Sequence, residues 1–194
     1  MFRLSKPGAA DIVASLAEVH DSIDSRARVL SLRHGVAADA LPFAFAHDRL
    51  CTRLGDGKEV FDCARHAFRN WLQFDLGWVR VANPEIPIVA GQIVAVEVHA
   101  FGLWSLNLSR IVETIDTGTQ FGFLYATSSH HAEEGEERFL LELIDGAAWY
   151  LIEAVSRPRH PLARLMYPAT RRLQHRFAHE SRMRILHTVK NDGR

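Results

Sequence analysis

The chain is poor in cysteine, which limits both its redox chemistry and its metal chemistry. Only two cysteines, Cys51 and Cys63, occur among 194 residues, and they are not spaced as a C-x-x-C motif. This excludes a disulfide framework and a cysteine-rich zinc site. Reduced thiols of a cytoplasmic protein are the simplest interpretation.

Long apolar runs and nucleotide-binding loops are also missing. No run approaches the roughly 20 apolar residues of a membrane-spanning helix, and the N-terminus lacks the apolar core of a signal peptide. Gly55-Asp56-Gly57 matches neither a P-loop nor a dinucleotide-binding motif. We expect a cytoplasmic location, no membrane span, no cofactor and no bound metal.

The net charge is zero, but the charges are unevenly distributed. Residues 157–194 contain ten Lys or Arg residues against two acids, whereas residues 1–156 contain thirteen against twenty-one. We interpret this as a solvated basic helix that balances an acidic body. A surface for phosphate or for an anionic membrane is the alternative, and no nucleic-acid partner is expected.

Residue periodicity predicts helices at both ends of the chain and strands between them. Apolar residues recur every three or four positions in residues 9–30 and from Asp56 to about Phe74. Alternation predicts strands at 48–54, 78–81, 92–99, 105–116, 121–125, 138–143 and 147–155. Asp145-Gly146 predicts a tight hairpin turn between the last two.

The last helix is predicted to begin at Pro161 and to carry an apolar stripe. The stripe consists of Leu162, Leu165, Met166, Ala169, Leu173 and Phe177. Pro168 lies inside this pattern, so we expect a kink, or a short helix followed by a second one. His160 is expected to cap or pack against the helix start.

This order of elements predicts an α+β protein. A curved antiparallel sheet of about seven strands that wraps around a long C-terminal helix is the helix-grip fold. We expect an N-terminal helical extension over residues 1–46, a helix-grip-like domain over 47–190, and a tail over 191–194.

Several spaced motifs carry a family resemblance. They include Phe74-Asp75-Leu76-Gly77-Trp78, Phe101-Gly102-Leu103-Trp104, Gly135-Glu136-Glu137-Arg138-Phe139 and Ser156-Arg157-Pro158-Arg159-His160-Pro161. From Leu54 to Phe177 the chain resembles the domain-of-unknown-function family DUF1990. In its order of elements this family is similar to START-like and Bet v 1-like helix-grip proteins (SRPBCC). The resemblance implies a cavity between sheet and helix, and it transfers no catalytic residue because the family has none established.

The candidate ligand-binding residues are large aromatic or charged side chains expected near the concave face of the sheet. They are Trp104, Arg110, Tyr125, Glu137, Trp149, Tyr150 and Arg157. Ordinary core packing is the alternative for the aromatics, and hydrogen bonding to carbonyl groups is the alternative for Arg157. Alternation places Glu137 on the face of Phe139, where a carboxylate needs a partner, and Arg110 is the candidate. Trp149 is expected to be substantially buried, so that truncation to alanine costs about 3–5 kcal/mol.

Other polar clusters favour structural interpretations. Glu133 and Glu134 are expected in a solvated acidic loop. His175 and His179 have metal-ligand spacing, but without a third ligand a solvated helix face is favoured. Neither Ser156 nor Cys63 has the sequence context of a nucleophile.

Three functions remain open on these observations. The first is binding of a small, largely apolar molecule between the sheet and the C-terminal helix. The second is an enzyme of the cyclase or hydrolase type that uses Glu137, Arg110, His99 or Tyr150 in the cavity. The third is a protein-interaction or regulatory domain with a filled core. A cavity with a buried ionisable pair favours catalysis, a dry cavity favours carriage, and a filled core favours interaction.

Overall fold

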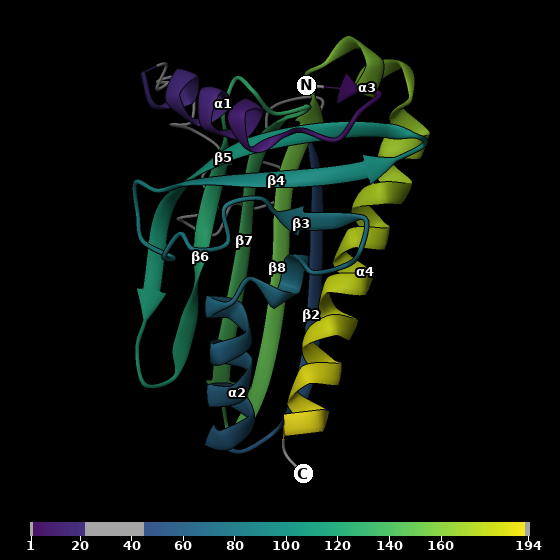
Figure 1. Ribbon diagram of the computed structural model, residues 1–194. Coiled ribbons are helices and arrows are strands. Elements are labelled where there is room, and N and C mark those ends of the chain that lie inside the picture. The colour runs from purple at the N-terminus through teal and green to yellow at the C-terminus, as the bar shows by residue number, and fades with distance from the viewer. Residues whose placement is uncertain (1, 22–44, 193–194) are drawn as a thin grey trace.

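The structure is a computed structural model that describes residues 2–21 and 45–192. Its elements are β1 (Phe2–Arg3), α1 (Ala9–Asp21), β2 (Ala46–Asp56), α2 (Lys58–Arg69), the 3-10 helix η3 (Leu72–Phe74), β3 (Val79–Val81), β4 (Ile93–Ala100), β5 (Leu103–Asp116), β6 (Gln120–Thr127), β7 (Glu133–Ile144), β8 (Ala147–Pro158), α3 (Pro161–Leu165) and α4 (Tyr167–Asp192). Figure 1 shows a curved sheet with α2 and α4 on one face and α1 at its upper end. Residues 22–30 of the predicted first helix lie outside the described residues.

The strands form one antiparallel sheet in the order β2-β8-β7-β6-β5-β4-β3, and β1 pairs with β5. The predicted α+β, helix-grip architecture is therefore confirmed: the seven strands β2 to β8 form the sheet, and the long helix α4 follows them. The additional strand β1 has only two residues, Phe2 and Arg3, which pair with Ser105 and Trp104. A strand of this length shows no alternation that sequence periodicity detects.

The hairpin between β7 and β8 turns at Asp145-Gly146, as predicted. Both residues have positive φ angles, 50° and 75°. This backbone matches the right-handed twist of the flanking strands and is readily adopted by an Asp-Gly pair. The ladder then runs without interruption from Ile144 opposite Ala147 to Glu133 opposite Pro158, so this hairpin carries residues from the turn into the candidate site.

Two glycines permit close approach between neighbouring strands. A Cβ atom on Gly122 would lie 2.2 Å from the carbonyl oxygen of Phe139, and one on Gly135 would lie 2.1 Å from that of Val155. Real Cβ atoms do not tolerate such distances, so these positions require glycine as the sheet is built. Gly135 belongs to one of the family motifs of the sequence.

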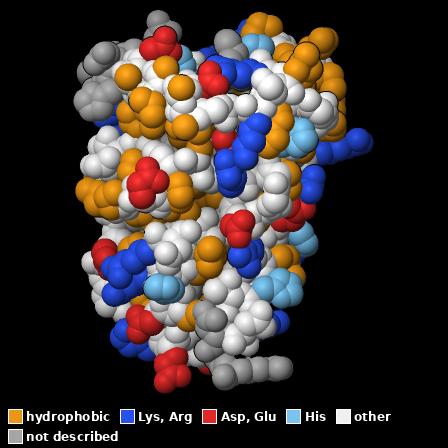
Figure 2. Space-filling model, in the orientation of Figure 1, with side chains coloured by type: hydrophobic (Ala, Val, Ile, Leu, Met, Phe, Trp, Pro, Cys, Tyr) orange, Lys and Arg blue, Asp and Glu red, His pale blue; other side chains and the backbone are white. Residues whose placement is uncertain are grey.

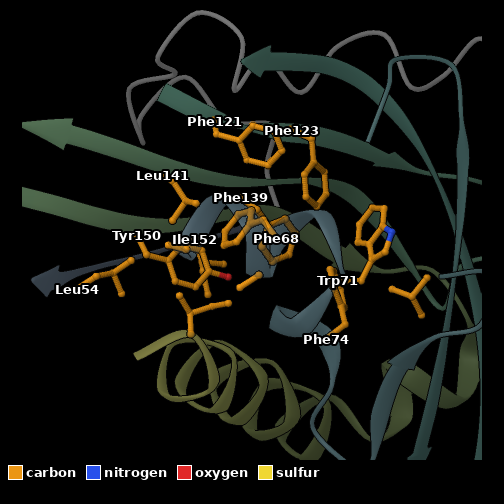
Figure 3. Packing of buried hydrophobic residues seen from close by; sticks show 14 of the residues in the cluster. Leu54, Phe68, Trp71, Phe74, Phe121, Phe123, Phe139, Leu141, Tyr150 and Ile152 are labelled. Carbon is orange, nitrogen blue, oxygen red and sulfur yellow. The ribbon is translucent and has the colours of Figure 1, made fainter. Parts of the chain in front are cut away.

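Aromatic side chains from α2, η3 and the concave face of the sheet form the main core. Phe139 is fully buried, and its ring lies 5.1 Å from Phe123, 5.2 Å from Phe74 and 6.1 Å from Phe177 between centroids. Figure 3 shows the labelled side chains of these elements pointing toward one another. The core therefore joins the sheet, η3 and α4 into one unit.

The N-terminal segment packs on the opposite, convex face. Val19 of α1, with Ile12 and Leu16, contacts a buried apolar patch on β4 and β5 that consists of Ile93, Ala95, Leu106 and Leu108. These strands therefore have apolar residues on both faces, and α1 shields the outer one.

The C-terminal helix is broken at the predicted place. α3 ends at Leu165, α4 begins at Tyr167, and Pro168 occupies the first turn of α4. His160 caps α3 as expected, because its Nδ1 accepts a hydrogen bond from the Leu162 amide at 3.1 Å.

The predicted apolar stripe is wrong at Leu165 and Met166, which are 79% and 45% exposed. The break between α3 and α4 interrupts the helical periodicity there, so these two side chains are exposed although Leu162, Leu173 and Phe177 on either side of the break are partly buried. The buried stripe instead continues toward the C-terminus through Phe177, Ser181, Ile185 and Val189, of which Phe177 is partly buried.

Candidate functional site

A cavity of about 640 Å³ lies between the concave face of the sheet and the helices α3 and α4. Most of its wall is apolar, and the walls come from the sheet, η3 and both C-terminal helices. The apolar lining includes Phe74, Val79, Val96, Val98, Leu103, Ile152, Leu162, Leu173 and Phe177. The volume lies within the range of small-molecule sites.

Exposed apolar side chains surround one end of this cavity. Phe101, at the turn between β4 and β5, is 70% exposed and lines the cavity together with Met166. Leu165 and Tyr167 are exposed on either side of Met166 in the chain. Figure 2 shows hydrophobic side chains gathered at the upper right, over α3 and the tip of this hairpin. We call this group (Phe101, Leu165, Met166, Tyr167) the apolar rim.

Tyr125 and Glu137 form a hydrogen-bonded pair on the cavity wall. They are register partners on β6 and β7, and the Tyr125 hydroxyl donates to Oε2 of Glu137 at 2.5 Å. Burial raises the pKa of Glu137 to about 7, and the nearby carboxyl groups of Glu133 and Asp48 add to this rise. Burial, together with the adjacent Glu137, raises the pKa of Tyr125 well above its ordinary value. The pair therefore holds an exchangeable proton near neutral pH.

Glu133 also faces the cavity, and the solvated loop predicted for Glu133 and Glu134 is wrong, because both residues belong to β7. Glu133 begins β7, where its Oε2 accepts hydrogen bonds from Ser156 at 2.9 Å and from Gln174 of α4. Burial raises the pKa of Glu133 in spite of these two donors. The error arose because β7 begins at Glu133, five residues before the strand start predicted at Arg138.

An ion pair next to Glu133 fixes α4 to the edge strand β2. Arg171 donates to both oxygens of Asp48, at 2.5 and 2.6 Å, and to Oε1 of Gln174 at 2.7 Å. Burial alone would raise the pKa of Asp48, but Arg171 and His175 lower it below its usual value. Gln174 thereby links Arg171 to Glu133, so the position of α4 depends on these polar contacts.

His131 contributes an imidazole to the cavity wall. Its Nδ1 accepts a hydrogen bond from the Glu133 amide at 3.0 Å. Burial lowers the pKa of His131 to about 4, so the ring is neutral at physiological pH. The same Nδ1 lies 3.1 Å from the carbonyl oxygen of Glu133, so it has a backbone partner in either neutral tautomer.

The structure brings together two of the seven candidate residues, Tyr125 and Glu137, on the cavity wall. Tyr150 faces the same side of the sheet but lies in the packed core, where its hydroxyl is 2.8 Å from Oγ of Ser181. The other four, Trp104, Arg110, Trp149 and Arg157, alternate with residues of the cavity or core and are directed to the convex side.

Trp104 and Arg157 make contacts on the convex side of the sheet. Trp104 stacks on His99, with 4.4 Å between ring centroids. Arg157 donates to Glu134 at 2.9 Å and lies over the ring of Phe45. Trp149 is only partly buried, so the cost of its truncation is expected to be well below that of a core aromatic.

Arg110 does not pair with Glu137. Its Nη1 donates to the carbonyl oxygen of Gly91 at 3.2 Å, on the other side of the sheet. Tyr125 occupies the position beside Glu137 instead, because β6 and not β5 is the neighbour of β7. His99 is on the convex side as well, stacked on Trp104.

Sequence reasoning missed several polar residues of the cavity, among them Asp48, His131 and Gln174. Extending the alternation of β7 backward from Glu137 would have found Glu133, because both occupy the same strand face. No local sequence pattern marks Asp48, His131 or Gln174. These three residues come together only because α4 packs across β2 and β7.

The Glu137 carboxyl should make stability depend on pH. Its folded pKa is raised, so folding takes up a proton between the ordinary carboxyl value and about 7, and stability falls as the pH rises through that window. We expect Glu137→Gln to flatten this slope. Between about pH 5 and pH 8, the free energy of unfolding of the variant should rise by about 1–3 kcal/mol relative to that of wild type.

Urea unfolding at several pH values measures this difference. Glu142→Gln, on the opposite face of the same strand, is the matched control and should follow wild type. His131 acts in the opposite direction, since its lowered pKa removes stability as the pH falls below the ordinary histidine value. Both curves contain that contribution, so their difference isolates Glu137. Parallel curves for Glu137→Gln and wild type would contradict the buried carboxyl.

Within the described residues, no group of three or more His, Cys, Asp or Glu side chains is placed to hold a metal ion. His175 lies 3.4 Å from Asp48, and His179 contacts Arg182. In the same part of the chain, no helix combines the length and apolar character needed to cross a membrane.

The curved antiparallel sheet and the long helix α4 that it wraps define a helix-grip fold. The chain superimposes on the Zhui aromatase/cyclase from Streptomyces sp. R1128 with a TM-score of 0.54 at 12% identity, covering 77% of this chain and 96% of that one. It superimposes on the di-domain ARO/CYC StfQ from the steffimycin biosynthetic pathway with a TM-score of 0.55 at 10% identity, covering 97% and 62%. At these identities the similarity shows the fold alone.

The chain belongs to the family described as a domain of unknown function, DUF1990, whose family model matches residues 32–184. A UPF0548 protein of Dictyostelium discoideum is 34% identical over 158 residues, which cover 75% of this chain and 73% of that protein. A UPF0548 protein of Deinococcus radiodurans is 31% identical over 199 aligned positions, which cover 95% and 98%. The resemblance seen in the sequence motifs is thereby confirmed.

Proposed function

We propose that this protein binds a small, largely apolar molecule in the cavity between the sheet and α4. The observation that carries the proposal is the cavity itself, about 640 Å³ and mostly apolar. A filled α+β core leaves no such space, and an interaction domain has no need of it. The helix-grip neighbours and the apolar rim at one end of the cavity support the same function.

Native mass spectrometry of protein purified from its own cells tests this proposal directly. A retained small molecule that adds a defined mass supports it. Screening apolar and aromatic compounds for a rise in melting temperature is the complementary test, because a ligand that binds only the folded state stabilises it. No retained mass and no shift across the panel would contradict the proposal.

A cavity-filling variant makes the test specific for this site. Ala154 lines the cavity on β8, and we expect Ala154→Phe to lower ligand affinity by about tenfold or more, because its ring occupies the ligand's space. Its stability without ligand should stay within about 1 kcal/mol of wild type, since the ring enters space that is not packed. Ala147→Phe, on the other face of β8, is the control and should bind as wild type does in calorimetry. Equal affinities for both variants would place the ligand elsewhere.

A cavity-based enzyme is the second candidate, and Glu137 favours it. A carboxyl with a pKa near 7, hydrogen-bonded to a phenol and facing an apolar cavity, suits general acid–base catalysis. Of the residues first considered for such chemistry, Arg110 and His99 are on the convex face and Tyr150 lies in the packed core, which leaves Glu137. Tyr125 and His131 are its neighbours on the cavity wall. A change in the mass of the retained ligand during incubation, abolished by Glu137→Gln, would support this reading. An unchanged ligand would favour carriage.

A further inference from the structure

Two carboxyl groups of the cavity wall, those of Glu133 and Glu137, form no ion pair with the described residues. Every hydrogen bond that the structure gives to the carboxyl oxygens of Glu133 and Glu137 comes from a neutral side chain, namely Ser156, Gln174 or Tyr125. Within residues 2–21 and 45–192, neither carboxyl group forms an ion pair. The nearby guanidinium of Arg171 lowers the pKa of Glu133 through its charge, but its hydrogen bonds go to Asp48 and Gln174.

Strand geometry directs both carboxyl groups toward the same space. Glu133 and Glu137 are four residues apart on β7 and so share its cavity face, and Gly135 between them contributes only backbone to the lining. The two acids are close enough for Glu133 to raise the pKa of Glu137. Their side chains retain accessible surface although they lie deep in the protein, because they line the cavity.

We propose that the ligand is an apolar molecule with a basic nitrogen, whose ammonium group lies against Glu137 and Glu133 at the polar end of the cavity. This inference rests on the proposed function. An ammonium group supplies the missing cation and donates hydrogen bonds to both carboxylates, while the apolar part fills the space toward Phe74, Val96 and Leu173. A buried carboxylate is costly unless it takes up a proton or is paired, and a cationic ligand supplies the pairing.

Two arginines of the cavity wall compete for the head group: Arg49, which is exposed on β2, and Arg182 on α4. Arg182 is the more buried of the two. It lies on α4 eight residues after Gln174, about 12 Å along the helix axis, and its buried Nε has no hydrogen-bond partner among the described residues. An anionic ligand would pair with Arg182 and would avoid the two glutamates. The charge of the ligand's head group therefore decides between the two ends of the cavity.

Three probes that share one naphthyl skeleton test the head group: naphthylmethylamine, naphthylmethanol and naphthoate. Calorimetry at a pH above the pKa of Glu137 measures their affinities for the full-length wild-type protein. We expect the amine to bind about tenfold or more tightly than the alcohol, and the carboxylate to bind most weakly. Equal affinities for amine and alcohol, or tightest binding of the carboxylate, would overturn the inference.

Variants then assign the preference to the carboxyl groups. Glu137→Gln should reduce the affinity for the amine by about tenfold and change that for the alcohol by less than about threefold. Glu133→Gln should act in the same direction, and it serves as the second variant should Glu137→Gln not fold. Glu142→Gln, on the convex face, is the control. An amine preference that survives both cavity variants would also overturn the inference.

The outcomes of these experiments distinguish failure of the head-group inference from failure of the proposed ligand binding. If compounds of the apolar panel bind while the amine has no advantage over the alcohol, the head-group inference fails and apolar ligand binding stands. If neither the panel nor the three probes bind, and no ligand is retained in native mass spectrometry, both fail together.

Discussion

Deleting residues 160–194 is expected to abolish cooperative folding. The C-terminal helix supplies Ile185 and Val189, both buried against the main core, and Phe177, whose ring packs against Phe139. It also supplies Ser181, the partner of the Tyr150 hydroxyl. Each buried apolar side chain of this kind contributes about 1.5–3 kcal/mol, so their joint loss is comparable to the whole stability of a domain, about 5–15 kcal/mol.

Thermal unfolding by circular dichroism and gel filtration measure this effect. The truncated chain should aggregate or melt without a cooperative transition, because the concave face of the sheet is left uncovered. A chain shortened only by residues 191–194 is the control and should melt close to wild type. A soluble truncation at residue 159 with a sharp transition would contradict the helix-grip arrangement, in which the sheet needs α4 as its cover.

Phe139→Ala is expected to cost about 3–5 kcal/mol of unfolding free energy. Phe139 is fully buried, and its ring contacts those of Phe74, Phe123, Tyr125 and Phe177. Its truncation removes apolar contact on every side and leaves a void that rigid neighbours close only in part. Because Tyr125 is one of these neighbours, the Tyr125–Glu137 pair should lose its fixed position as well.

Urea unfolding of Phe139→Ala beside Trp149→Ala tests the assignment of the two sheet faces. Trp149 lies on the convex face and is partly buried, so its truncation should cost no more than about 1–2 kcal/mol. A cost for Trp149→Ala equal to that for Phe139→Ala would mean that the faces are assigned wrongly. The same measurement in the presence of a ligand shows whether loss of Phe139 also weakens binding.

Much of the fold follows from local sequence patterns. Alternation and short turns predict the antiparallel strands, Asp145-Gly146 predicts the hairpin, and Pro161 and Pro168 predict where α3 begins and where the helix breaks. Each of these depends on neighbours within a few residues, for which backbone sterics and hydrogen bonding are decisive. The position of Glu137 on the cavity face also follows, because it shares its parity with Phe139.

Only the tertiary structure determined which face of each strand is buried and which side chains contact one another on that face. Alternation shows that Trp149 and Tyr150 lie on opposite faces of β8, but it does not show which face is buried. Tyr150 is buried because α4 covers its face of the sheet. The strand order determined that Tyr125 is the partner of Glu137. The start of β7 at Glu133 determined that this side chain faces the cavity. The cavity depended on a volume left between the sheet and a broken helix. Such a volume is set by distant elements packing together, so no local pattern of residues encodes it.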